Sequence, residues 1–134
     1  MIEQELPRYR GGRTLLAAVL VELLLVPPTI IIFNTAAQPE AVLDVVIPIL
    51  CFGLFIPAGM WVAKGTSAPI ANGVIAGIWG ILLYVAMTLV LNGAVADFDL
   101  ESSVRPAYVL AHGMKVVGGV IGGIIVARRT GASA

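Results

Sequence analysis

The sequence is poor in charged residues, cysteine and histidine. Only 12% of its 134 residues are Asp, Glu, Lys or Arg, about half of the share that a soluble domain of ordinary composition carries. The net charge is zero, so nothing favours binding to nucleic acid. Cys51 is the only cysteine, which excludes a disulfide within the chain and argues against a cysteine-based metal site. We therefore expect neither a metal ion nor another cofactor.

Motifs that carry catalysis are also missing. The chain has no P-loop, no HExxH, no Ser-His-Asp or Cys-His set, and no GxGxxG in a strand–helix context. Asp97, Asp99 and Glu101 lie close together, but their spacing matches no established cation-binding loop. A solvated acidic loop is the expectation for them. We therefore predict that the protein is not an enzyme.

Long apolar stretches separate the few charged clusters. Apolar residues make up 59% of the chain, and the mean hydropathy is +1.00. A helix needs about 20 apolar residues to cross the hydrocarbon core, and continuous rather than alternating runs favour helices over barrel strands. The sequence predicts one all-α transmembrane domain, residues 1–134, folded as an up-down bundle of four helices. The predicted spans are about 14–34, 43–63, 69–91 and 107–127.

The basic residues are distributed unevenly around these spans. In the up-down arrangement six of them fall on one side of the membrane: Arg8, Arg10, Arg13, Lys64, Arg128 and Arg129. The opposite side has Arg105 and the acidic residues Glu40, Asp44, Asp97, Asp99 and Glu101. Lys and Arg are enriched in cytoplasmic loops. We expect a multi-pass protein of a bacterial inner membrane with both termini in the cytoplasm.

A cleaved signal peptide is the alternative for the first span. A basic amino end, an apolar run and the small residues Thr35-Ala36-Ala37 fit that pattern. The run is longer than the core of an ordinary signal peptide, and Glu22 interrupts it. A retained first span is the prediction.

Glycines mark the third and fourth spans. All of them except Gly80 lie at GxxxG spacing, which lets helix backbones approach closely in lipid. The set comprises Gly73, Gly77 and Gly80 in the third span, and Gly118, Gly119, Gly122 and Gly123 in the fourth. We predict that the two spans pack against each other within the chain. The alternative is that one glycine register of the fourth span packs against a second chain.

Two charged residues fall within the predicted hydrocarbon. Counting along the helices at 1.5 Å per residue puts Glu22 roughly 13 Å and Lys115 roughly 20 Å from the cytoplasmic boundary. His112 shares the helix face of Lys115. An unpaired charge at this depth is costly, so Glu22 and Lys115 are expected to meet. Three alternatives follow: the two residues form a structural ion pair, they form a proton or ion site with His112 as a shuttle, or Lys115 snorkels outward and the two do not meet.

The pattern in two of the spans resembles a known transporter family. Glu22 in the first of four spans, with Trp79 within Gly77-Ile78-Trp79-Gly80 in the third, is similar to the small multidrug resistance transporters. The resemblance implies that Glu22 is a coupling carboxylate. It is confined to these residues. Lys115 has no counterpart in the family pattern, and the strong charge bias differs from that of its dual-topology members.

Two functions follow from these features. The first is a non-enzymatic structural or accessory subunit, which packs in a homo-oligomer or a larger complex within the lipid bilayer. The alternative is a small oligomeric transporter coupled to protons or ions through Glu22. A polar cavity at Glu22 would favour the transporter, whereas a closed, dry contact would favour the subunit.

Overall fold

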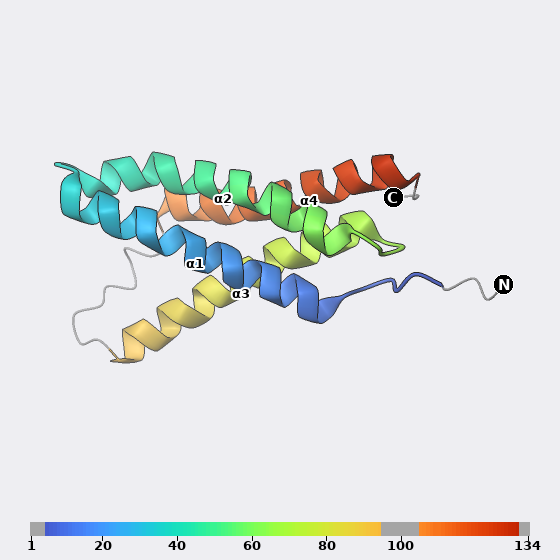
Figure 1. Ribbon diagram of the computed structural model, residues 1–134. Helices are drawn as coiled ribbons and strands as arrows, with labels where there is room; N and C mark the ends of the chain where they lie inside the picture. The colour runs from blue at the N-terminus through green and yellow to red at the C-terminus, as the bar shows by residue number, and fades with distance from the viewer. Residues whose placement is uncertain (1–4, 95–104, 132–134) are drawn as a thin grey trace.

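The computed structural model describes residues 5–94 and 105–131. All regular secondary structure in this part of the chain is α-helical (Figure 1). The helices are α1 (Gly11–Thr35), α2 (Pro39–Ala63), α3 (Pro69–Ala94) and α4 (Pro106–Thr130). Each is about 37 Å long at 1.5 Å per residue, and all four are long and apolar enough to cross a membrane. The chain is a multi-pass membrane protein, and its described residues form four helices of this kind.

The helices extend beyond the predicted spans because polar residues continue them. Helix α2 begins four residues before its predicted span, at Pro39. Proline suits the first turn, where its missing N–H would have no partner, and Glu40 in that turn complements the helix dipole. Helix α4 continues through Arg128 and Arg129 to Thr130, and Gly131 caps it with a φ of 65°, the left-handed conformation typical of helix ends.

Helix α4 is the most buried helix of the bundle. It packs most extensively against α2 and next against α3, whereas α1 packs on α2 and α3 and has little direct contact with α4. The apolar stretch of α4 is 39% buried, compared with 22% for each of the other helices. Consecutive helices run in opposite directions, so that α1 begins and α4 ends at the same end of the molecule (Figure 1).

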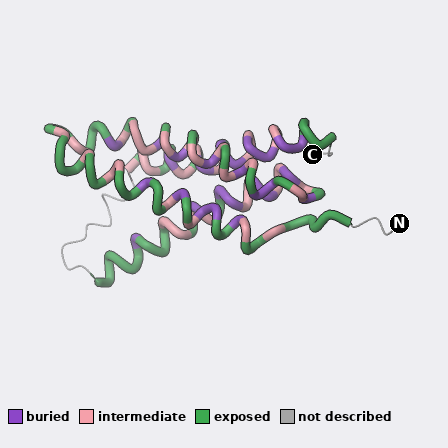
Figure 2. The backbone as a smooth tube through the Cα atoms, viewed as in Figure 1, coloured by how far each residue is buried: buried purple, intermediate pink, exposed green. Residues whose placement is uncertain are grey.

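Packing is tight in the half of the bundle nearer the chain ends and loose in the other half. Figure 2 shows buried residues concentrated where α1 begins and α4 ends, and exposed residues along the far ends of α1 and α3. Beyond Gly80, Thr88 is the one buried residue of α3. Phe55 of α2 is the largest fully buried side chain and lies near the middle of the bundle. The fold therefore has a tight half, nearer the chain ends, and a splayed half at the other end.

Both glycine registers of α4 face other helices of the same chain. Gly118 and Gly122 face α2: a Cβ on Gly118 would lie 2.6 Å from the carbonyl oxygen of Phe52, and one on Gly122 would lie 2.6 Å from the Met60 nitrogen. Real Cβ atoms essentially never come within 3.0 Å of another heavy atom. Only glycine permits this approach, and Gly59 of α2 completes the contact because its missing Cβ leaves room for the Gly119 backbone.

The other register faces α3. Gly119 lies directly against the backbone of Gly73, and a Cβ on Gly123 would lie 2.7 Å from the Ile70 Cα. A Cβ on Gly77 would likewise lie 2.7 Å from the Cα of Val116 in α4. One glycine register of α4 packs against α2 and the other packs against α3. This geometry does not fit the alternative in which one register packs against a second chain.

Candidate functional site

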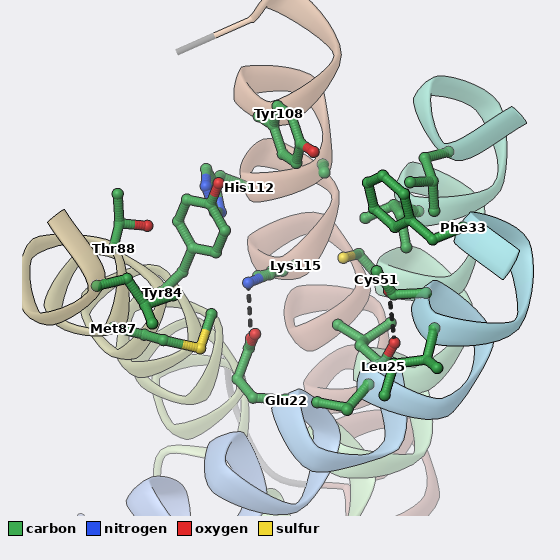
Figure 3. A pocket seen from close by; sticks show the side chains of 17 residues that line it. Glu22, Leu25, Phe33, Cys51, Tyr84, Met87, Thr88, Tyr108, His112 and Lys115 are labelled. Carbon is green, nitrogen blue, oxygen red and sulfur yellow. Dashed lines mark hydrogen bonds and ion pairs between the residues drawn. The ribbon is translucent and has the colours of Figure 1, made fainter. Parts of the chain in front are cut away.

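The two intramembrane charges meet where the tight half of the bundle ends. The Lys115 Nζ of α4 lies 2.6 Å from the Glu22 Oε1 of α1 (Figure 3). The same ammonium donates to the carbonyl oxygen of Gly80 at 3.3 Å and lies 5.5 Å from the centroid of the Tyr84 ring. Lys115 is 2% exposed, whereas the Glu22 side chain is 20% exposed. The lysine is thus enclosed, and the carboxylate is the accessible member of the pair.

Gly80 leaves the space that the pair occupies. A Cβ at this position would lie 2.6 Å from the Phe55 Cζ and 3.2 Å from both the Glu22 Oε1 and the Lys115 Cδ. The sequence predicted Gly80 to be a helix-packing residue. In the structure it admits the ion pair as well, because the missing side chain makes room and the backbone carbonyl accepts a hydrogen bond.

His112 lies near this pair without bonding to it. Its ring packs against Tyr84 with centroids 4.4 Å apart, and Tyr84 in turn stacks on Tyr108 at 6.0 Å. The His112 Nδ1 is buried and has no hydrogen-bond partner. The structure therefore joins Glu22 and Lys115 directly and sets His112 one helical turn away, in an aromatic cluster.

All three predicted polar residues line one cavity of about 450 Å³. Every helix contributes to its wall. From α1 come Glu22, Leu25, Val26, Thr29, Ile30 and Phe33; from α2, Leu43, Ile47 and Cys51; from α3, Tyr84, Met87, Thr88 and Leu91; and from α4, Tyr108, Ala111, His112 and Lys115. Figure 3 shows the ion pair at the base, with Tyr108 and His112 above Lys115. The wall is mostly apolar, and its two charges are at one end.

The cavity opens on one side of the bundle. On the side of α2 and α4 its wall is closed, because Leu43, Cys51, Ala111 and Lys115 are buried. On the side of α1 and α3 the wall residues are also exposed on the surface of the molecule. These residues are Val26, Ile30, Phe33, Met87 and Leu91. The opening therefore lies between the splayed ends of α1 and α3, and apolar side chains form its rim.

A second polar cluster holds the start of the chain. The buried Asn72 of α3 accepts a hydrogen bond from the Arg10 backbone N–H at 3.0 Å and donates to the Arg8 carbonyl at 2.9 Å. The Arg13 guanidinium donates to the Lys64 carbonyl at 3.1 Å. These bonds fasten the segment before α1 to the start of α3, and the start of α1 to the turn between α2 and α3. Sequence reasoning missed Asn72, because a single polar residue near a helix start has no periodic partner.

The opposite end of the bundle carries an ion-pair triad. Arg105, which precedes α4, donates to Glu40 at 3.0 Å and to Asp44 at 2.6 Å. Asp97, Asp99 and Glu101 lie outside the described residues. Within residues 5–94 and 105–131, no three His, Cys, Asp or Glu side chains are grouped so that they could hold a metal ion.

The transporter resemblance fits the structure at one of its two positions. Glu22 lines the cavity, but Trp79 does not, and Lys115 neutralises the carboxylate that would stand alone in the family pattern. Comparison with models of protein families, with curated proteins and with solved structures finds no match to this chain, so its function is inferred from its own residues.

Proposed function

We propose that the protein is a small transporter of the bacterial inner membrane, coupled to protons or ions through Glu22 and without enzymatic activity of its own. One observation carries this proposal: the Glu22–Lys115 pair forms the base of a cavity of about 450 Å³ instead of a closed contact, although the wall of this cavity is mostly apolar and only its base is charged. Cavities of roughly 300–1,000 Å³ are typical of sites for small molecules. A carboxylate within a membrane span is a functional-site candidate, and the exposed fraction of Glu22 makes it reachable from the cavity.

We also propose that both termini lie in the cytoplasm. Its support is the clustering of basic residues at one end of the bundle, where Arg13 bonds to the carbonyl of Lys64 and where α4 ends with Arg128 and Arg129. The acidic partners of Arg105 lie at the other end. Positive charge is retained on the cytoplasmic side of a membrane. In this orientation the cavity belongs to the periplasmic half of the bilayer.

The accessory subunit is the second candidate, and the near-complete burial of Lys115 favours it. A lysine that is 2% exposed and bonded to both Glu22 and Gly80 suits an ion pair that fixes the helices in place. In that case the protein would act by packing in an oligomer or a larger membrane complex, and the cavity would have no occupant.

Reconstituted vesicles distinguish these candidates. The experiment follows internal pH with a trapped dye while small molecules of different charge are added outside. In the transporter, at least one class drives proton movement, and Glu22→Gln abolishes it because the amide cannot exchange a proton. Glu40→Gln removes a carboxylate that is 72% exposed and should leave the movement intact. Proton movement by Glu22→Gln at the wild-type rate would rule out the transporter. No movement with any class, from correctly folded protein, would favour the subunit.

A further inference from the structure

Among the residues that the structure describes, the charges that face the cavity sum to zero. Glu22 faces it from α1, Cys51 from α2, Tyr84 from α3, and Lys115, His112 and Tyr108 from α4. One carboxylate and one ammonium are paired at 2.6 Å, and the remaining groups are neutral in their ordinary forms. A net charge in an apolar, membrane-embedded space is strongly disfavoured. Any ligand therefore has to leave the total charge of the cavity close to zero.

This balance links an anion to a proton. A proton on Glu22 alone would leave the charge of Lys115 without a partner, and an anion alone would add an unbalanced negative charge. Together they cancel: the proton neutralises the Glu22 carboxylate, and the anion replaces it beside the Lys115 ammonium. No covalent bond forms, and one proton is taken up for each anion bound. We infer that the cavity binds a lipophilic monoanion together with one proton, a substrate class that rests on the transport function proposed above.

The polar lining supports this ligand. Tyr84 and Tyr108, which carry hydroxyl groups, line the cavity together with His112, whose buried Nδ1 lacks a hydrogen-bond partner. Figure 3 shows these three side chains grouped above the ammonium. Hydroxyl and imidazole N–H groups are donors, and donors are what an anion requires. A protonated Glu22 would add one more.

The apolar lining indicates that the rest of the ligand is apolar. The opening between α1 and α3 is rimmed by Val26, Ile30, Phe33, Met87 and Leu91. In a membrane-spanning bundle this side faces lipid tails, so an apolar chain can lie across the rim while its head group reaches Lys115. A lipophilic cation fits less well, because Lys115 already neutralises Glu22 and a second positive charge would be unbalanced.

Binding of two matched probes to the protein in lipid nanodiscs tests the inference. The probes are 1-octanesulfonate, which is permanently anionic, and octyltrimethylammonium, which has the same chain length and a permanent positive charge. Empty nanodiscs correct for partition into lipid. The wild type should bind the sulfonate with uptake of about one proton, measured by calorimetry in buffers of different ionisation enthalpy, and its affinity should rise about tenfold for each pH unit lowered. It should bind the ammonium probe more weakly.

Two variants test the roles of Glu22 and Lys115 in the binding of the probes. Glu22→Gln mimics the protonated carboxylate and should bind the sulfonate without proton uptake and without pH dependence. Lys115→Met should lose sulfonate binding and bind the ammonium probe better than the wild type, because Glu22 is then uncompensated. Lys64→Met, which removes an exposed lysine outside the cavity, should bind both probes as the wild type does.

The wild type alone decides the matter if a variant fails to fold. Preference of the wild type for the ammonium probe, or sulfonate binding without proton uptake, would overturn the inference while leaving a ligand-binding cavity in place. Binding of neither probe by folded wild type would overturn the inference, and the vesicle experiment then decides separately whether the protein transports anything.

Discussion

Lys115 of α4 bonds to Glu22 of α1 across 93 residues of sequence, although these two helices have little other contact. The pair therefore bridges helices that α2 and α3 hold apart. Charge attraction at 2.6 Å in a space of low dielectric supplies a link that side-chain packing does not supply there. The direct link between α1 and α4 and the charges of the cavity are thus supplied by the same two side chains.

A double-mutant cycle measures this link. Glu22→Gln and Lys115→Met should each lower the thermal stability in detergent, because each leaves one charge buried without its partner. One-sided loss of a buried pair costs about 3–5 kcal/mol in soluble proteins, and the 20% exposure of Glu22 places this case toward the lower end. The double variant buries no net charge and should recover part of the loss. Strictly additive losses would show that the two residues do not interact.

The sequence was sufficient for the number and approximate bounds of the helices, because each apolar run is long enough to span a bilayer. It also indicated the contact between Glu22 and Lys115, because two opposite charges at similar depth have few other partners. The orientation in the membrane stays a prediction. The cavity could not be predicted, because it depends on the lateral arrangement of the helices: Gly59 brings α2 against α4, but no GxxxG spacing marks this residue.

Replacement of Gly119 by alanine should destabilise the single chain. A Cβ there would collide with the Gly73 backbone, and overpacking typically costs about 1–3 kcal/mol. Gly113 is the matched control on the same helix, since a Cβ there would meet nothing within 4 Å. Gly113→Ala should keep or raise the thermal stability, because alanine favours helix. Light scattering should show the oligomeric state of Gly119→Ala unchanged. If the variant kept its stability but the oligomer dissociated, Gly119 would instead pack at an interface between chains.

Asn72→Leu should release the segment before α1. Leucine has similar volume but leaves the Arg10 N–H and the Arg8 carbonyl without their partner, at a cost of about 1–3 kcal/mol. Trypsin should then cut after Arg8 or Arg10 faster than in the wild type. Asn34→Leu is the control, because Asn34 is exposed and bonds only within its own helix. Equal cleavage rates in both variants would show that Asn72 does not hold this segment.

Reporter fusions test the proposed orientation. Reporters at either terminus and in the Lys64–Ser67 turn should be cytoplasmic, and reporters near Gln38 or Asp99 should be periplasmic, because basic residues stay inside. A periplasmic signal from a terminus would contradict the four-span arrangement or its direction. Loss of an amino-terminal tag would reveal cleavage of the first span as a signal peptide.

Gly80→Ala should uncouple Glu22 from Lys115. The added Cβ would clash with the Phe55 ring at 2.6 Å and crowd both members of the pair at 3.2 Å, so the ring has to shift and the two charged side chains are pushed out of their present contact. The double-mutant cycle of Glu22→Gln and Lys115→Met, repeated in this background, should therefore give a smaller coupling free energy than in the wild type. Gly53→Ala provides the control, since a Cβ on Gly53 meets nothing within 4 Å, and the coupling should there be unchanged. An undiminished coupling in the Gly80→Ala background would mean that the pair does not depend on the space this glycine leaves.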